Sequence, residues 1–513
     1  MLWLALHLPL LSLEAFCATL TEADRQRPVV LLDGHRISAV NAAAAQCGIR
    51  PGLKRATALA LAAELLPGQA DAARDAAALQ AVAHAALAFT PSVTLQDTQT
   101  VLLEVQASLR YFGGLAALQR RLHEALAPLG HPVPHGVQWA AAPTALGAVW
   151  LARWQPRGRG DLVLGAHATQ PVALQRLLGE APVDLFSGHP QHGAAWQAMG
   201  LHTLADLRRL PRDGLARRFG QGLLDDIDRA CGHQPDPREW LALPAAFESR
   251  LELYARADST EQVLLGAAVL LARLVAWAQA RQARVAAFTL CMQHERSHRP
   301  GNEAAALATE LRIEMAEPAL DAAHLQLLLR ERLAHCTLAA PTLELRLHCR
   351  DLVQASAPHG ELFPTRASES AGLARLLERL RARLGDAHVQ RLVAVADHRP
   401  EHASLAVPAQ GLGPRVASAE AFAVTALPLH RPAWLLPEPL PLAERAGLPW
   451  LEGRPLQLVS GPERIEAGWW DAAPTARDYF IAQAEDGSLV WLWRGRLPAV
   501  PGAAQWFLQG RFG

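Results

Sequence analysis

Residues 41–66 read NAAAAQCGIRPGLKRATALALAAELL and form the most informative pattern in the chain. Alanine and leucine, which favour helix, dominate both sides of the central CGIRPG segment at residues 47–52. The glycines and the proline of that segment favour a tight turn, because glycine tolerates positive φ and proline presets the φ of a turn residue. The pattern therefore predicts two helices joined by a turn.

Outward from this stretch, the first two thirds of the chain predict a multidomain α+β protein. Residues 2–8 and 100–105 are short apolar runs typical of strands, set among helical stretches in a domain that spans 1–165. Residues 166–240 are mostly helical, and Thr203 is placed to cap a helix. Residues 241–353 then follow the order strand, helix, strand, strand, helix, strand.

The remaining third differs in composition. Residues 354–370 form a polar linker around two apolar side chains. A helix is predicted at 373–384, and the rest of the region 371–513 is rich in proline and tryptophan, with strand-like segments at 455–459, 479–483 and 489–494. We expect a small mixed or β extension.

Bulk composition narrows the function classes. The 513 residues predict about three to five domains, and the 49 acidic and 49 basic residues balance, so any nucleic-acid contact must come from local patches. The six cysteines contain no CxxC pair, which argues against a metal site or disulfide framework and favours a cytoplasmic location. The apolar opening, residues 1–13, lacks a basic flank and predicts a buried strand and helix rather than a signal peptide or membrane span.

Three stretches resemble Y-family translesion DNA polymerases. Residues 41–65 resemble the fingers segment, residues 2–14 the first palm strand with its helix, and residues 96–114 the second catalytic strand. The resemblance implies a right-hand architecture, with palm and fingers at 1–165, a thumb at 166–240 and a little finger at 241–353. It covers about two thirds of the chain.

The positions that perform chemistry in that family are occupied differently here. The family holds two magnesium ions between aspartate and glutamate side chains. By sequence counting, its carboxylate positions fall on Ala5, His7, Gln99 and Thr100, and its nucleotide-binding positions fall on Ala42, Ala45 and Gln155. None of these supplies an anionic ligand, which implies a protein without polymerase activity, metal or other cofactor. The alternative is an active translesion polymerase that uses Asp97, Glu104 or Asp33.

The combination resembles the ImuB proteins, a catalytically degenerate group of Y-family homologues. That resemblance implies an adaptor in SOS-type mutagenic translesion synthesis, working with an error-prone C-family DNA polymerase and an ImuA-type, RecA-like partner. The C-terminal candidates for partner contacts are Trp469, Trp470, Arg477, Trp491 and Trp493. Paired tryptophans beside arginines are equally typical of a packed β core.

The linker contains His359-Gly-Glu-Leu362-Phe363, which resembles the motif by which bacterial polymerases dock the sliding clamp, with histidine in place of glutamine. An extended segment can offer Leu362 and Phe363 to a groove. Alternatively, these two side chains pin the linker to the preceding domain.

A cluster of arginines lies in the helical region and is a candidate for contacts with primer–template DNA: Arg208, Arg209, Arg212, Arg217 and Arg218. Such side chains bind backbone phosphates without reading sequence. A solvated helix face remains an alternative. A third hypothesis, favoured by the balanced charge, is an interaction hub without DNA affinity.

Overall fold

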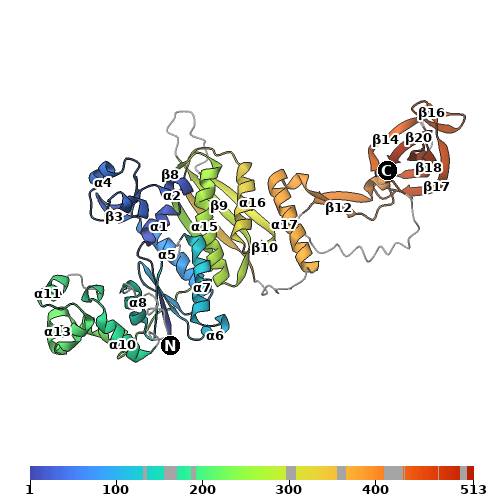
Figure 1. Ribbon diagram of the computed structural model, residues 1–513. Helices are drawn as coiled ribbons and strands as arrows, with labels where there is room; N and C mark the ends of the chain where they lie inside the picture. Colours follow the sequence, from blue (N-terminus) through green and yellow to red (C-terminus); the bar gives the residue numbers. More distant parts are fainter. Residues whose placement is uncertain are drawn as a thin grey trace. The chain divides into compact units, whose positions relative to one another are not determined.

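The computed structural model describes residues 1–130, 136–154, 170–186, 192–295, 308–354, 366–409, 431–432, 434–471, 473–496 and 505–512. It divides into two compact units, residues 1–365 and 366–513, and each is treated by itself (Figure 1). The element order is mixed helix and strand in the first unit and mostly strand in the second. The predicted α+β class with a β-rich C-terminal region is therefore confirmed.

A four-stranded antiparallel sheet, the first sheet, organises the N-terminal part. Its order is β5-β6-β1-β7, with β1 at Trp3–His7, β5 at Val93–Asp97, β6 at Thr100–Glu104 and β7 at Gln138–Ala142. Alternate residues of a strand face opposite sides. Leu4 and Leu6 enter one core and Trp3 and Ala5 enter another, so both faces of the sheet are covered.

Helices pack on both faces of the first sheet. The face that carries Leu4 and Leu6 is covered by α1 (Leu11–Cys17), α5 (Ala72–Leu87) and α7 (Leu115–Leu126). The opposite face is covered by α8 (Ala145–Trp154). Two short helices, α2 (Glu22–Gln26) and α6 (Leu109–Phe112), complete this part.

The 41–66 stretch forms a small subdomain of its own with a three-stranded sheet. The order is β3-β2-β4, with β2 at Val29–Asp33, β3 at Arg36–Val40 and β4 at Leu66–Gln69, joined by helices α3 (Ala42–Gln46) and α4 (Arg55–Leu61). The two predicted helices and their turn are confirmed. Gly48 and Gly52 adopt φ of +80° and +90°, a region that favours glycine.

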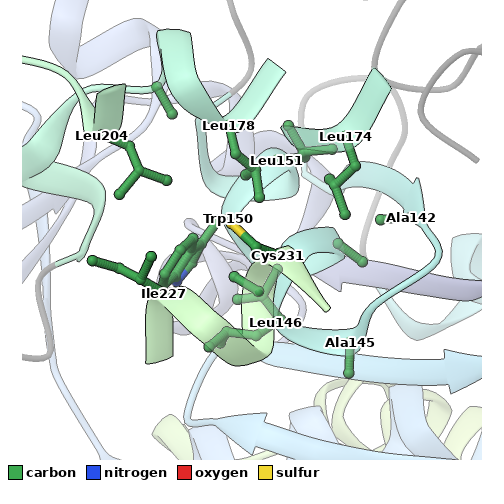
Figure 2. Packing of buried hydrophobic residues seen from close by; sticks show 14 of the residues in the cluster. Ala142, Ala145, Leu146, Trp150, Leu151, Leu174, Leu178, Leu204, Ile227 and Cys231 are labelled. Carbon is green, nitrogen blue, oxygen red and sulfur yellow. The ribbon is translucent and has the colours of Figure 1, made fainter. Parts of the chain in front are cut away.

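A helical segment follows and shares a core with α8 (Figure 2). It comprises α10 (Pro171–Glu180), α11 (Gly193–Ala198), α12 (Leu204–Arg209), α13 (Arg212–Phe219) and α14 (Gln221–Cys231). Trp150 of α8 lies among Leu178, Leu204 and Ile227 in that core. The predicted cap is confirmed, because the Thr203 hydroxyl accepts the Asp206 amide in a reciprocal capping box.

A second antiparallel sheet has the order β10-β9-β11-β8, with β8 at Phe247–Ala257, β9 at Ala283–His294, β10 at Ala308–Ala319 and β11 at Thr342–Gln354. Helices α15 (Thr260–Ala280) and α16 (Ala322–Ala334) pack beside each other on it. The predicted strand and helix order of this region is confirmed.

Helix α15 is long and apolar enough to cross a membrane, yet 72% of its most apolar window is buried inside the protein. Its Ala272 and Ala276 enter the core beneath the first sheet, against α5. Its apolar character is therefore explained by contacts on several sides, as for a core helix of a globular protein.

The second unit begins with α17 (Arg366–Leu384) and a hairpin of β12 (Gln390–Ala394) and β13 (Ser404–Pro408). A seven-stranded sheet of order β16-β15-β14-β20-β19-β18-β17 follows: β14 Trp434–Arg445, β15 Leu448–Leu451, β16 Arg454–Pro455, β17 Gln457–Ala467, β18 Thr475–Gln483, β19 Leu489–Gly495 and β20 Trp506–Arg511. One core gathers around Leu442, Leu492 and Trp506, and a second around Tyr479 and Trp491.

Candidate functional site

The end of the first sheet brings together side chains from three elements. His7 closes β1 and pairs in register with Thr100, the first residue of β6. The imidazole Nδ1 and the Thr100 hydroxyl are 3.0 Å apart, a hydrogen bond that joins the two strand ends. The corner between β5 and β6 lies beside them, and it carries Asp97 and Gln99.

An ion pair occupies this corner. Arg153, in the last turn of α8, donates to the carboxylate of Asp97, and the same carboxylate accepts the backbone amide of Gln99 at 2.7 Å. Both charged side chains are about three-quarters buried, with 26% and 29% exposed. A partly buried guanidinium is a permanent cation, so it neutralises Asp97 where it stands.

His7 adds no charge at neutral pH. Burial lowers the pKa of its imidazole from 6.5 to about 4, with a further lowering from the Arg153 cation that outweighs the opposing effect of Asp97. The sheet end therefore presents a neutral imidazole, a hydroxyl and a neutralised carboxylate. This set provides no cluster of anionic oxygens of the kind that divalent magnesium requires.

The structure shows where the counted catalytic positions lie. Ala5 has no exposed surface and packs between β6 and β7, in register with Leu102 and Ala140, two residues inside the strand end. His7, two residues further along β1 and on the same face, lies at the strand end. Thr100 lies at this end, fully buried, and Gln99 in the adjoining turn.

The three carboxylates considered as alternative ligands do not converge. Asp97 and Glu104 lie at opposite ends of the β5–β6 hairpin, and the length of β6 separates the strand ends by about 13 Å. Glu104 accepts the amides of Leu2 and Gln106, each at 3.2 Å, and Asp33 belongs to the separate three-stranded sheet. Among the described residues, no group of three or more His, Cys, Asp or Glu could hold a metal.

The counted nucleotide positions lie on the short helix α3. Ala42 and Ala45 are both exposed there and, three residues apart, they share one face. Their methyl groups offer no hydrogen-bond donor to a triphosphate. Gln155, the third counted position, lies outside the described residues.

The five candidate DNA-binding arginines lie on α12 and α13, and all are exposed. Arg212 differs from the others, because its guanidinium donates to both oxygens of the buried Asp228 at 3.1 and 2.5 Å. The pKa of Asp228 lies below its ordinary value, mainly because of these hydrogen bonds. Arg212 therefore joins α13 to α14, and the proposed DNA contact rests mainly on Arg208, Arg209, Arg217 and Arg218.

The clamp motif cannot be placed, because His359, Leu362 and Phe363 lie outside the described residues. The motif remains a prediction from sequence. The structure describes the chain up to residue 354 at the end of β11 and again from residue 366, where α17 begins.

The C-terminal tryptophans divide by burial. Trp469 and Trp470, just after β17, are 75% and 54% exposed, with their rings edge to face at 4.6 Å. Trp491 is only 2% exposed and stacks on Tyr479 at 4.4 Å. The assignment of Trp491 as a partner-contact residue is corrected, because a buried indole can reach no partner without unfolding.

Arg477 and Trp493 lie between these extremes. The Arg477 guanidinium lies 4.4 Å from the Trp493 ring centroid and donates to Glu401 at 2.8 Å. Trp493 stacks on Phe507 at 4.2 Å and donates its indole N–H to Gln509. Both side chains are thus part of the packing of the sheet face.

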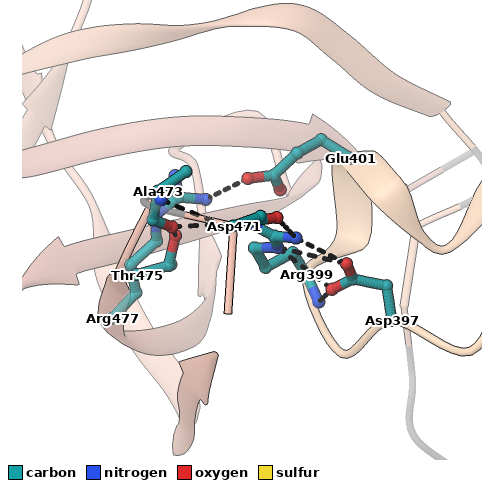
Figure 3. Close-up of polar contacts among 7 residues, drawn as sticks. All are labelled: Asp397, Arg399, Glu401, Asp471, Ala473, Thr475 and Arg477. Atoms are coloured by element: carbon teal, nitrogen blue, oxygen red, sulfur yellow. Dashed lines mark hydrogen bonds and ion pairs between the residues drawn. The ribbon is translucent and has the colours of Figure 1, made fainter. Parts of the chain in front are cut away.

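Arg399, which the sequence analysis missed, joins two aspartates close to the exposed tryptophan pair, and Figure 3 shows its contacts with both aspartates. Arg399 is 3% exposed, and its guanidinium donates to Asp397 at 2.7 Å and to Asp471, the residue after Trp470. It also lies 5.7 Å from the Trp470 ring centroid. These hydrogen bonds lower the pKa of Asp397 to about 2. Because Asp397 and Asp471 are far apart in sequence, no local pattern could reveal this arrangement.

Comparison with known proteins shows which proteins the chain is similar to. Residues 11–137 match the family model described as impB/mucB/samB. Relatives called Protein ImuB from two strains of Caulobacter vibrioides are 28% identical over 494 residues, which cover 91% of this chain and 100% of theirs.

Solved structures similar to the chain are DNA polymerases. A Y-family chimera of Dbh and Dpo4 is 14% identical, with 68% of this chain and 98% of that chain covered and a TM-score of 0.38. DinB from Sulfolobus solfataricus is 15% identical, with 69% and 100% covered and a TM-score of 0.37. Residues 11–137 are thus similar to the impB/mucB/samB family, and the chain over most of its length is similar to the ImuB proteins of Caulobacter vibrioides.

Proposed function

We propose that this protein is a non-catalytic adaptor in DNA damage tolerance, of the SOS-type mutagenic translesion pathway. It binds primer–template DNA with its first unit and holds an error-prone C-family polymerase and an ImuA-type partner through its second unit. The linker between the units docks the sliding clamp. The similarity to the ImuB proteins over 91% of the chain supports the general role, and the end of the first sheet supports the absence of catalysis.

The observation that carries the proposal is the internally neutralised corner at His7, Asp97 and Arg153. A polymerase of this kind needs at least two anionic side chains that share a metal. Here the single carboxylate at the corner is already paired with a guanidinium, and the neighbouring side chains are a neutral imidazole and a hydroxyl. The rival hypothesis, a live polymerase using Asp97, Glu104 or Asp33, is disfavoured because these carboxylates do not lie together.

DNA binding is supported by the exposed arginines of α12 and α13. Arg208 and Arg209 end α12, and Arg217 and Arg218 end α13, with the side chain of Arg209 80% exposed and within 3.5 Å of Asp206. A surface pair of this kind contributes little and is easily exchanged for a phosphate contact.

A titration by fluorescence anisotropy tests the DNA contact. A labelled primer–template is bound by intact protein and by an Arg208→Ala/Arg209→Ala/Arg217→Ala/Arg218→Ala variant at several salt concentrations. The proposal expects binding that weakens steeply with salt, and a shallower salt dependence for the variant, because each phosphate contact releases a counterion. Binding of intact protein that is undetectable even at low salt would instead favour the interaction hub without DNA affinity.

Binding of the protein to immobilised sliding clamp tests the proposed clamp contact of the linker. Intact protein is compared with Leu362→Ala/Phe363→Ala and with Leu373→Ala/Leu376→Ala, a control that removes two leucines of α17 that are 46% and 50% exposed. The proposal expects only the linker variant to lose binding. Equal binding by all three proteins would place the clamp contact elsewhere in the chain. Loss of binding by the control variant alone would transfer the contact to α17.

A further inference from the structure

A cavity of about 620 Å³ lies in the first unit where α5 meets β8 and α15. It is distant in sequence from the neutralised corner, and none of the proposed DNA, clamp or partner contacts uses its residues. Its polar lining includes Arg74, Gln80, His84, Ser249 and Arg273. Alanines of α5 together with Phe247 and Leu251 of β8 supply apolar walls. The size and the mixed lining are those of a small-molecule site.

Arg273 is the unusual member of this lining. It is the only charged residue between Glu261 and Arg281 in the apolar helix α15, and it is 4% exposed. Among the described residues, the one hydrogen bond of its side chain is a donation to the Ser249 hydroxyl at 3.2 Å. A guanidinium has five N–H donors, so most of its hydrogen-bonding capacity is left for whatever enters the cavity.

In the part of the chain that the structure describes, no acidic side chain forms an ion pair with Arg273. Arg74 is itself a cation, and it lies near Asp75 at 3.6 Å and donates to the carbonyl of Gln69. Burial lowers the pKa of His84 to about 4, so this imidazole is neutral at physiological pH. Burial also lowers the pKa of Arg273, to about 10, with a smaller contribution from Arg74, as expected for a cation without an acidic partner.

Arg399 is a second buried arginine and allows a comparison with Arg273. Arg399 is buried to a similar extent but is held by two aspartates, Asp397 and Asp471. Burying a guanidinium without a partner is costly, and buried charges in proteins are normally paired. Among the described residues no acid takes this part for Arg273, which leaves its guanidinium available to an anionic ligand.

The rest of the lining limits what that anion is. Asp71, Glu248 and Glu252 also line the cavity, and the two glutamates are exposed. Their carboxylates disfavour a ligand with several negative charges, such as a triphosphate. These carboxylates can accept hydrogen bonds from amino or hydroxyl groups of a ligand that carries a single phosphate. That phosphate can reach Arg273, because a planar guanidinium binds a phosphate through two hydrogen bonds.

We propose that this cavity binds a small phosphate-bearing ligand, with Arg273 and Ser249 holding the phosphate and the α5 side of the cavity receiving the remainder. The shared chemistry fits a mononucleotide or free inorganic phosphate. None of the residues proposed for contacts with DNA or partner proteins lines this cavity.

Calorimetric titration of the full chain with dAMP and, separately, with inorganic phosphate tests this site. We expect saturable binding by intact protein, weakened about tenfold or more in Arg273→Met, since a charge-assisted bidentate contact is lost. The matched control is Arg330→Gln, which alters an exposed arginine on α16, and it should bind as intact protein does. Tighter binding of dAMP than of phosphate identifies the nucleotide as the source, and equal binding identifies free phosphate.

Thermal unfolding without ligand separates a binding role from a structural one. We expect Arg273→Met to unfold at the same temperature as intact protein or higher, because the substitution removes an uncompensated buried charge. If that variant does not fold, Ala77→Phe, which fills the cavity from α5 and keeps Arg273, should abolish binding of dAMP. The proposal is overturned if neither ligand binds intact protein, or if a folded Arg273→Met or Ala77→Phe variant binds as tightly.

Discussion

The end of the first sheet and the exposed tryptophan pair of the second unit use charge and apolar surface in opposite ways. At the sheet end, where the Y-family resemblance places chemistry, Asp97 is neutralised by Arg153 and His7 is held neutral. In the second unit, Arg399 and its two aspartates are satisfied internally, and they support two large indole rings that face solvent. The contrast agrees with the proposed adaptor, in which the first sheet is a scaffold and the partner contacts lie elsewhere.

The largest effect is expected from removing the exposed rings. Trp469→Ala/Trp470→Ala should weaken binding of the C-family polymerase or of the ImuA-type partner by about a hundredfold, because buried aromatic anchors dominate interface energies. The melting temperature should change little, since both rings are exposed. The control is Trp434→Ala, another tryptophan that is 73% exposed, on β14.

Binding of each partner to the immobilised variants provides the measurement. If the double variant binds both partners as intact protein does while Trp434→Ala does not, the partner surface lies on β14. Trp469 and Trp470 would then not be the partner contacts. Trp491→Ala serves a different purpose: it should lower the melting temperature, because it leaves a cavity beneath Tyr479.

A smaller effect should follow from breaking the charge pair in the helical segment. Arg212→Ala leaves the buried Asp228 carboxylate without its two main donors, and we expect a loss of about 2 kcal/mol in the free energy of unfolding, allowing for the exposure of Arg212. Arg217→Ala, which removes an arginine from the same helix, should cost less than about 0.5 kcal/mol.

Urea unfolding measures both variants, and the DNA titration is repeated on each. We expect Arg217→Ala to weaken DNA binding and Arg212→Ala to affect mainly stability. The reverse pattern, in which Arg212→Ala folds as stably as intact protein but loses DNA affinity, would return Arg212 to the proposed DNA surface.

The smallest effect concerns the pH dependence at the sheet end. The pKa of His7 is about 4 in the fold and 6.5 in the unfolded chain, so the unfolded state takes up a proton first as the pH falls. This contribution to stability is complete above pH 6.5 and is lost as the pH falls towards about 4. In His7→Gln, the free energy of unfolding should therefore fall by about 1 to 2 kcal/mol less between pH 7 and pH 4 than it does in intact protein.

Urea unfolding between pH 7 and pH 4 provides this measurement. His84, whose pKa burial also lowers to about 4, remains in the variant, so part of the decline should persist. An unchanged slope in His7→Gln would show that His7 is not held neutral at the sheet end.

The elements and the sites were not equally predictable from the sequence. Strands, helices and the Thr203 cap follow from local periodicity and local hydrogen bonding, and the order of elements in the first unit was accordingly predicted well. The ion pair between Asp97 and Arg153 joins positions that meet only after folding, and so does the ion pair between Arg399 and Asp471. Trp469 and Trp491 have the same side chain, and only their neighbours in the folded sheet decide that one is exposed and the other buried. Arg273 has a local signal, a lone charge in an apolar helix, but its cavity has none.

Primer extension by the isolated chain is the measurement that tests the central claim most directly. Intact protein and Arg153→Ala, which releases Asp97 from its ion pair, are incubated with primer–template, all four deoxynucleotides and Mg²⁺ or Mn²⁺, beside an active Y-family polymerase. The account predicts no added nucleotide with either protein, on damaged or undamaged template, under conditions in which the chain binds the DNA. Metal-dependent extension by intact protein that survives rigorous purification would contradict it, and extension by Arg153→Ala alone would show that the ion pair, rather than the missing carboxylates, suppresses catalysis.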